Sequence, residues 1–367
     1  MSLDVSFKLD RGDGVELSFK AGPGITALFG RSGAGKTTVV DAIAGLVRPQ
    51  SGHIAMDGRV LFDAQTGVNL KPHQRNMGYV FQQARLFPHM SVAGNLAYGQ
   101  RRRGGANRKR LAQVAELLGI EQLLDRRPAA LSGGEAARVS IGRALLSAPK
   151  MLLMDEPFAA LDAPRRAEIL PYLERLRDEE GLPIVYVSHN VAEVARLADT
   201  IVVLEQGLVL RAGPALDVLA DPATAAHFGA QDAGAVLLGR VAARYADGLM
   251  QVRLSGGEVL LPDIPAAVLG QSLRIRIAAR DIILSLSAPS GLSALNVLAC
   301  TVEELHEQNG SVLVKLRVGA DALLARITGR SAIHLGLRKG LACHAIIKSV
   351  SVAGGASIWT NAQEEIG

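Results

Sequence analysis

A glycine-rich octapeptide near the N-terminus has the residue types and spacing of a phosphate-binding loop. It fits the pattern G-x-x-x-x-G-K-[ST] and consists of Gly30, Arg31, Ser32, Gly33, Ala34, Gly35, Lys36 and Thr37. Glycines let the backbone curl so that its N–H groups face phosphate oxygens, and a following helix adds a partial positive charge. We expect Lys36 to reach the β- and γ-phosphates of a nucleotide and the Thr37 hydroxyl to ligate Mg²⁺, with Thr38 next in the site.

A short apolar run, residues 151–154, ends in the two carboxylates Asp155 and Glu156. Open α/β sheets bind ligands at the carboxyl ends of their strands, so we expect both acids to face a bound nucleotide. Asp155 is then a candidate Mg²⁺ ligand and Glu156 a candidate general base for the attacking water. Alone, the pair would equally suit a strand that leads into a helix cap. Its place downstream of a phosphate loop favours the nucleotide site.

A third motif, residues 131–135, contains Ser132, Gly133, Gly134 and Glu135. The S-x-x-E spacing predicts a capping box and therefore the start of a helix. Its N-terminus and the glycine N–H groups would form a second anion site, although an ordinary helix cap would have the same residues. The motif resembles the signature of ABC ATPases, and the phosphate loop, signature and acidic strand follow one another in that family's order. The resemblance implies a homodimer that holds two ATP molecules between the phosphate loop of one subunit and the signature of the other.

Three smaller motifs also resemble those of ABC ATPases. Gln82 matches the Q-loop glutamine, which contacts Mg²⁺ and water, and Asp162 matches the D-loop aspartate, which crosses the dimer. His189 matches the switch histidine that contacts the γ-phosphate. Glu135 stands where the family most often has Gln, and we expect it to fold back onto its own cap. Phe7 is the nearest aromatic candidate for stacking on adenine, but its place on the apolar face of a strand favours core packing.

Alternating strands and helices predict a parallel α/β sheet up to about residue 230. The expected strands are 3–9, 25–29, 152–154 and 184–187, and the expected helices are 108–118, 135–146, 167–177 and one that begins near residue 36. From residue 234 onward, short alternating runs separated by Gly, Pro and Asp predict a small β domain. We therefore expect an ATPase domain over 1–230, a linker near 217–232, and a β domain over 231–367 with two degenerate repeats, 235–288 and 292–353.

The composition narrows the class of protein. The chain has 367 residues, of which 49% are hydrophobic and 20% charged, as in globular proteins of two or three domains. A net charge of +5 without a long basic block does not favour nucleic acid as a partner. Two cysteines, Cys300 and Cys343, suggest no disulfide framework and a reducing compartment. No window of about 18 apolar residues exists to span a membrane, so we expect any membrane role to depend on a partner.

The whole chain resembles the ATPase of molybdate importers, notably in residues 58–61, 84–89 and 141–146. This resemblance implies a RecA-like core with a helical subdomain, then an OB-like TOBE domain. It also implies ATP hydrolysis that drives uptake of molybdate or tungstate, at the cytoplasmic face of the inner membrane. The implied partners are two permease subunits that dock near Gln82–Met90 and, indirectly, an extracytoplasmic oxyanion-binding protein. Importers of sulfate, ferric iron or sugar share this architecture and stay open as alternatives.

The C-terminal residues extend the resemblance to molybdate-binding β domains. Residues 293–296 resemble the Ser-Ala-Arg-Asn start of such domains, with Leu295 in place of the arginine, and Lys348 and Ser349 resemble the Lys-Ser near their end. The candidate oxyanion ligands are therefore Ser293, Asn296, Lys348 and Ser349, and molybdate or tungstate is a candidate regulator. Two other classes of function agree less well with the sequence. A soluble ABC ATPase of nucleic-acid repair or translation is expected to contain a long coiled-coil insertion or a basic arm, and neither is present. A pure oxyanion-binding module would leave the ATPase motifs unexplained.

Overall fold

The computed structural model describes residues 2–9, 14–102, 105, 107–225, 227–229, 232–308, 310–349 and 356–358. Contacts within the chain define two compact units, Met1–His189 with Leu197–Ala212, and Asn190–Arg196 with Gly213–Gly367. Residues 213–229 therefore pack with the second unit. The domain boundary that we expected at residue 230 stays a prediction, and the two units are described separately below.

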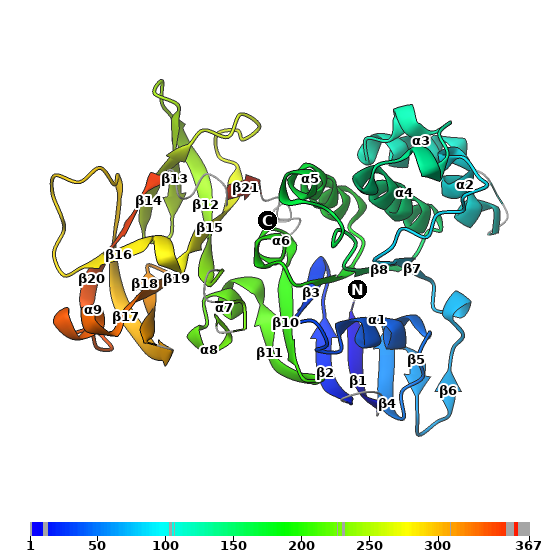
Figure 1. The fold of residues 1–367 in the computed structure, drawn as a ribbon, viewed down its shortest axis with the longest axis horizontal. Helices are drawn as coiled ribbons and strands as arrows, with labels where there is room; N and C mark the ends of the chain where they lie inside the picture. The colour runs from blue at the N-terminus through cyan, green and yellow to red at the C-terminus, as the bar shows by residue number, and fades with distance from the viewer. Residues whose placement is uncertain are drawn as a thin grey trace. The chain divides into compact units, whose positions relative to one another are not determined.

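The first unit is built on an eleven-stranded sheet with the order β6-β5-β4-β1-β2-β11-β10-β3-β9-β8-β7. Its strands are β1 (Leu3–Leu9), β2 (Val15–Ala21), β3 (Ile25–Phe29), β4 (Ser51–Met56), β5 (Arg59–Asp63), β6 (Val68–Asn69), β7 (Met77–Val80), β8 (Met151–Asp155), β9 (Ile184–Ser188), β10 (Thr200–Glu205) and β11 (Leu208–Pro214). Figure 1 shows these strands with the helices of the unit.

The sheet has a parallel part and an antiparallel part. Strands β10, β3, β9, β8 and β7 pair in parallel, and β3, β8 and β9 are buried along their whole length. Strand β1 pairs antiparallel with β2 and β4, and β4 with β5. The expectation of a parallel sheet up to residue 230 is therefore wrong for the antiparallel part. Alternating burial along β1 and β2, with one face in the core, is the usual pattern of an antiparallel sheet.

The described residues of the first unit form the helices α1 (Lys36–Ala44), α2 (Val92–Arg102), α3 (Arg108–Leu117), α4 (Gly133–Leu146) and α5 (Ala163–Glu180). Helices α2, α3 and α4 gather into a helical group (Figure 1) with a common core that includes Leu96, Val114 and Ile141. Gly142 lets α4 approach α2, because a Cβ there would lie 2.8 Å from the Leu96 side chain. Phe7 is only 3% exposed in the core against α1, so its expected packing role is confirmed.

The second unit contains two five-stranded sheets with corresponding strand orders, β14-β13-β12-β15-β21 and β19-β18-β17-β20-β16. Its elements are α6 (Val191–Leu197), α7 (Ala215–Leu219), α8 (Pro222–Ala225), β12 (Gly234–Arg244), β13 (Leu249–Leu254), β14 (Gly257–Pro262), β15 (Ser272–Ala278), β16 (Ile282–Ser285), β17 (Asn296–Gln308), β18 (Ser311–Val318), β19 (Asp321–Thr328), α9 (Gly329–His334), β20 (Ala342–Ile347) and β21 (Ala356–Ile358). The fifth strand is exchanged: β16 completes the second sheet and β21 the first.

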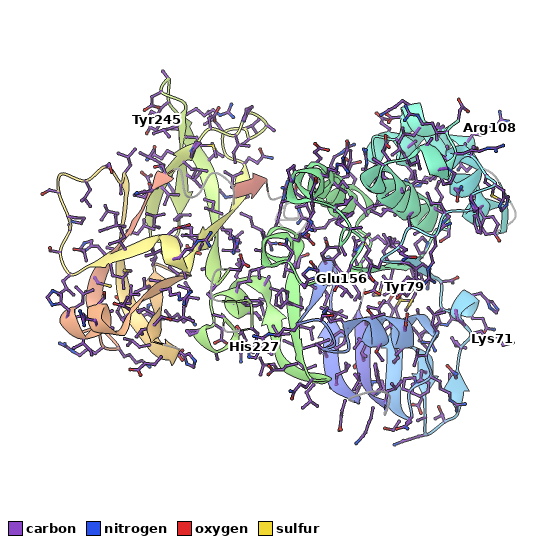
Figure 2. The ribbon with its side chains drawn as sticks, viewed as in Figure 1. Lys71, Tyr79, Arg108, Glu156, His227 and Tyr245 are labelled. Atoms are coloured by element: carbon purple, nitrogen blue, oxygen red, sulfur yellow. The ribbon has the colours of Figure 1, made fainter. Side chains whose placement is uncertain are left out.

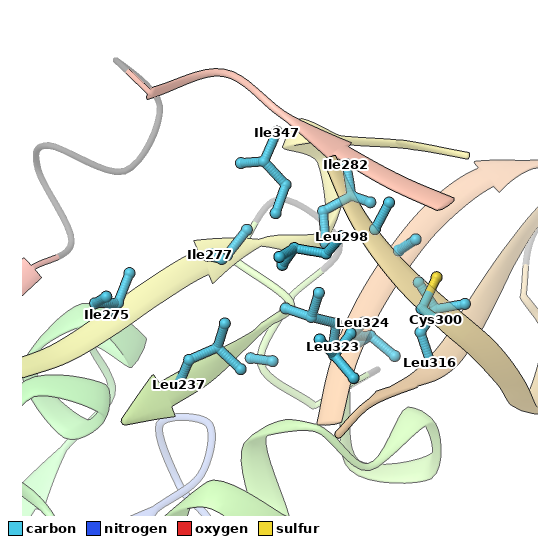
Figure 3. Packing of buried hydrophobic residues seen from close by; sticks show 14 of the residues in the cluster. Leu237, Ile275, Ile277, Ile282, Leu298, Cys300, Leu316, Leu323, Leu324 and Ile347 are labelled. Atoms are coloured by element: carbon cyan, nitrogen blue, oxygen red, sulfur yellow. The ribbon is translucent and has the colours of Figure 1, made fainter. Parts of the chain in front are cut away.

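The two sheets share one hydrophobic core. Figure 3 shows Leu237 and Ile275 of the first sheet in the same cluster as Leu298, Leu316 and Leu323 of the second. The segment expected as a linker, residues 217–232, instead includes part of α7 and all of α8. Val218 and Leu219 are buried there, and α7 contacts β12. The linker prediction is therefore wrong, because apolar side chains in this segment have a core to enter.

Candidate functional site

The phosphate loop lies between β3 and α1 and depends on its glycines. Gly33 and Gly35 have φ angles of 84° and 92°, in the left-handed region that favours glycine. At Gly30 the requirement is steric, because a Cβ there would lie 2.4 Å from the carbonyl oxygen of Leu204. Helix α1 begins at Lys36, directly after Gly35. The loop therefore presents backbone N–H groups at a helix N-terminus, as an anion site requires.

Lys36 is buried at the base of this loop, with 6% exposure. Its ammonium donates to the carbonyls of Gly30 (2.8 Å) and Arg31 (2.9 Å) and lies 3.7 Å from Oε1 of Glu156. Burial lowers the pKa of Lys36, and the nearby Glu156 carboxylate opposes that shift. The arrangement places a cation where phosphate oxygens would need one.

Asp155 ends strand β8 and contacts the phosphate loop directly. The Thr37 hydroxyl donates to Oδ1 of Asp155 over 3.1 Å. Burial raises the pKa of Asp155, and the hydrogen bond from Thr37 opposes this. A hydroxyl and a carboxylate oxygen side by side are the hard oxygen donors that Mg²⁺ prefers. The donor set therefore fits this ion.

Glu156 follows Asp155 in a strained backbone conformation with φ of 42°. The strain is local to the site, which is where such conformations concentrate. Its N–H donates to the carbonyl of Val187 on β9 (3.2 Å), and Oε2 lies 3.2 Å from Nδ1 of His189, just after that strand. Parallel pairing of β8 with β9 thus brings the acid and the histidine together. Figure 2 marks Glu156 among the side chains of this unit.

Arg75 fixes the far end of α1. Its side chain is fully buried, and its guanidinium donates to the carbonyls of Ala42 and Ile43 at 2.8 Å each and to Leu70 at 2.9 Å. The carbonyls of Ala42 and Ile43 lie in the last turn of α1, where carbonyls lack their usual helical partners, although that of Ala42 also accepts the N–H of Gly45 (3.2 Å). A cation also suits the negative end of a helix. Arg75 therefore holds the helix whose first residues form the phosphate loop.

The signature segment has the capping box that its sequence predicts. Glu135 N–H donates to Ser132 Oγ (3.3 Å), and Ser132 N–H donates to Glu135 Oε2 (2.7 Å). The hydrogen bond from the Ser132 backbone holds the pKa of Glu135 below its usual value. The carboxylate is thus turned back onto the start of α4, as expected, and away from a position in which it would repel phosphate.

The predicted site residues fall into two groups. Contacts join Lys36, Thr37, Asp155, Glu156 and His189 into one cluster, called the acidic-edge cluster below. Gln82, Ser132, Gly133 and Asp162 are exposed, and no hydrogen bond or ion pair among the described residues ties them to that cluster. Asp162 caps α5 by accepting the N–H of Arg165 (3.1 Å). Their expected roles stay predictions.

The four candidate oxyanion ligands are only partly brought together. Asn296 is buried and lies 3.4 Å from the Ser349 hydroxyl, whereas Ser293 and Lys348 are exposed. The Asn296 side chain also accepts the N–H of Leu260 (2.6 Å) and donates to its carbonyl (2.9 Å). Its amide therefore bridges β17 to β14, which is a structural use of this residue that the sequence does not reveal.

Sequence reasoning also missed a contact between β7 and α1. Tyr79 on β7 donates its hydroxyl to Oδ1 of Asp41 on α1 over 2.8 Å. Burial and the Asp41 carboxylate raise the pKa of Tyr79, which stays protonated. No motif marks this pair, since the two residues stand 38 positions apart. Figure 2 labels Tyr79, which lies on the strand next to β8, the strand that leads into Glu156.

Two protein families match parts of this chain. The family description "ABC transporter" matches residues 13–159, and "TOBE domain" matches residues 292–354. The molybdenum import ATP-binding protein of Rhizobium johnstonii is 50% identical over 341 residues, covering 92% of this chain and 95% of the relative. That of Rhizobium meliloti is 48% identical over 357 residues, covering 96% and 99%. That of Salmonella choleraesuis is 45% identical over 329 residues, covering 90% and 93%.

Two solved structures resemble the chain in part. CbiO1 of Clostridium perfringens, part of the ABC transporter complex CbiONQ, has a TM-score of 0.53 and 28% identity and covers 60% of this chain and 90% of its own. The ATP-binding cassette MJ0796, a dimer in a post-hydrolysis state bound to ADP and Pi, has a TM-score of 0.50 and 25% identity and covers 59% and 99%. Two specific domains in the expected order, and relatives matched over 92–96% of this chain and 95–99% of their own length, place this chain in the family of molybdenum import ATP-binding proteins of ABC transporters.

Proposed function

We propose that this chain is the ATP-hydrolysing subunit of an ABC importer that takes up molybdate or tungstate. The observation that carries the proposal is the acidic-edge cluster, in which a phosphate loop, two carboxylates and a histidine meet in a chain that is about half identical to molybdenum import ATP-binding proteins. A nucleotide's phosphates would lie along the loop residues 30–38, with Lys36 as the cation.

Each group in the cluster has a chemical task in this proposal. Glu156 accepts the proton of the attacking water. His189, whose Nδ1 lies 3.2 Å from the Glu156 carboxylate, orients that carboxylate toward the γ-phosphate. Lys36 neutralises charge on the β- and γ-phosphates. Thr37 and Asp155, with Gln82, would hold Mg²⁺, which would lower the cost of charge on the transferred phosphoryl group.

The signature completes the site from a second copy of the chain. Ser132, Gly133 and Gly134 begin α4, so their N–H groups can receive a γ-phosphate held by the partner. Asp162 is the N-cap of α5 and would face the same partner in this arrangement. The dimeric state of the solved cassette with ADP and Pi supports this sharing. The functional unit is then a homodimer with two composite sites.

The membrane partners follow from the importer role. Among the described residues, no helix combines the length and the apolar character needed to cross a membrane. We propose that the homodimer lies on the cytoplasmic face of the inner membrane, where two permease subunits dock at residues 82–90. An extracytoplasmic oxyanion-binding protein would deliver substrate to the permease from the other side.

The β domain is proposed to sense the oxyanion. Asn296 and Ser349 lie together, and Lys348 could add a cation to a tetrahedral dianion, since charge-assisted hydrogen bonds are the stronger kind. Bound molybdate or tungstate would then reduce transport. Titration of the full chain with molybdate, with Lys348→Ala as the control, tests this. We expect heat of binding that weakens in the variant, and no heat at millimolar molybdate would contradict regulation at this site.

Uptake by a reconstituted transporter tests the main proposal. The chain, its permease and the binding protein are reconstituted in liposomes, with ATP in the compartment that contains this chain. Uptake of molybdate, tungstate, sulfate, ferric iron and maltose is then measured. We expect uptake of molybdate and tungstate alone, and none with Lys36→Ala. Preferential uptake of sulfate, iron or sugar would assign the chain to another importer of the same architecture.

A further inference from the structure

The loop that follows Gln82 is held against the signature helix by one guanidinium. Arg143, in the last turn of α4, donates from Nη1 to the carbonyl of Arg85 (2.8 Å) and from Nη2 to that of Ala84 (3.2 Å). Its Cζ also lies 5.2 Å from the centroid of the Phe87 ring. The carbonyls belong to residues 58 and 59 positions away in the sequence.

The hydrogen bonds from Arg143 reach a strained part of the backbone. Arg85 has a φ of 43°, a conformation that costs free energy for a residue with a side chain. Its own guanidinium lies 4.3 Å from the centroid of the Phe81 ring. The two hydrogen bonds from Arg143 to backbone carbonyls, together with the contact between Arg85 and the Phe81 ring, therefore stabilise a turn that the sequence alone would not favour.

The same contacts continue to the phosphate-loop helix. The Phe81 ring stacks on Tyr79, with 4.1 Å between centroids and 24° between planes, and Tyr79 is bonded to Asp41 on α1. An unbroken set of contacts thus runs from α4 through residues 79–87 to α1. Asn95, fully buried, adds a second anchor by pairing with both the N–H and the carbonyl of Phe87 (2.8 and 3.1 Å).

We propose that Arg143 is the positioning residue that couples movement of the 79–87 segment, which contacts the phosphate-loop helix through Tyr79, to the signature helix. Displacement of Phe87 by a partner would shift the carbonyls that Arg143 holds, and would shift Asp41 through the rings of Phe81 and Tyr79. The inference rests on the proposed importer function, in which this segment receives the permease. Arg143 touches no reacting atom in this scheme. Arg143 instead sets how strongly docking of the permease affects the nucleotide site.

The chain provides a matched control on the same helix. Arg138 also donates to two backbone carbonyls, Leu118 and Gly119 at 3.0 Å each, and lies 5.0 Å from the Tyr172 ring centroid. Its contacts have the same chemistry but lead to α3 and α5 rather than to the 79–87 segment. Lysine at either position keeps the charge but cannot reproduce the planar fork or its stacking on a ring.

The first experiment compares Arg143→Lys with Arg138→Lys in the complete transporter in liposomes. We expect Arg143→Lys to lower the stimulation of ATPase by the permease, relative to the isolated chain, by about fivefold to tenfold, which lies within the range of about twofold to thirtyfold for mutations along coupled networks. Arg138→Lys should leave that ratio unchanged. Equal ratios for the two variants would overturn the inference while leaving the importer function intact.

A second experiment needs no permease and therefore separates this inference from the proposed function. Hydrogen exchange is measured on the full wild-type chain and on Arg143→Lys, with and without MgATP. In the wild type, ATP should change protection of residues 79–87 and of α4 together. In the variant, the change in residues 79–87 should no longer be accompanied by the change in α4, while that at residues 30–44 persists. Unchanged joint protection in the variant would refute the coupling role even if transport is never reconstituted.

Discussion

Replacement of Glu156 by glutamine isolates proton transfer from every other role of this side chain. The carboxylate lies 3.2 Å from His189 Nδ1 and 3.7 Å from Lys36 Nζ. Glutamine has the same shape and can still accept a hydrogen bond from His189, but its amide cannot accept the proton of water. General-base catalysis contributes about 100- to 10,000-fold to a rate, so we expect Glu156→Gln to reduce kcat by that factor. This corresponds to about 3–5 kcal/mol of barrier.

ATP binding should survive this change or become tighter, because a negative charge near the phosphates is removed. The assay is single-turnover release of labelled phosphate, with nucleotide affinity measured by equilibrium titration on the same sample. Glu168→Gln, on the exposed face of α5, serves as the control for loss of one carboxylate. Hydrolysis within a few-fold of the wild type would refute the general-base role. Loss of ATP binding would instead mean that Glu156 mainly positions Lys36.

Three further outcomes follow from the contacts described above. A mixture of Lys36→Ala and Ser132→Arg chains should regain ATPase activity that each lacks alone, because some mixed dimers keep one intact composite site; full activity of either variant alone would contradict shared sites. Arg75→Met should destabilise the chain by about 2–4 kcal/mol in chemical denaturation, because it removes the hydrogen bonds from the buried guanidinium to the carbonyls of Ala42 and Ile43; an unchanged midpoint would contradict that role. The pKa of Glu135 is lowered on folding, so its cap contributes stability above the unfolded pKa and loses it as pH falls through the folded pKa; Glu135→Gln should flatten the acid limb of the stability profile, and an identical limb would count against the cap.

The sequence is most informative where a motif fixes the local geometry. Strand 25–29 and the helix start at Lys36 agree with β3 and α1, because a phosphate loop needs a strand before it and a helix after it. The capping box likewise places the start of α4 from two residues, Ser132 and Glu135. In each case chemistry requires one backbone conformation, so local residues suffice for the prediction.

Sequence reasoning fails where long-range contacts decide the structure. Whether β1 pairs parallel or antiparallel depends on its partners, residues 15–21 and 51–56. A single alternating run does not specify that direction. Helices α7 and α8 have only five and four residues, too short for a helical period to be visible. Contacts of Tyr79 with Asp41, and of Arg143 with residues 84 and 85, join segments that no local pattern relates.

The exchanged strands of the β domain bear on how it could sense an anion. Strand β16 follows the first sheet in sequence but pairs with β20 of the second, while β21 pairs with β15 of the first. Asn296 adds a side-chain bridge from β17 to β14, and one hydrophobic cluster includes residues of both sheets. Neither sheet can therefore shift without disturbing pairing in the other. An anion held by Ser349 or Lys348, just beyond β20, would act on both sheets at once, and a response of the whole domain would need no separate hinge between its repeats.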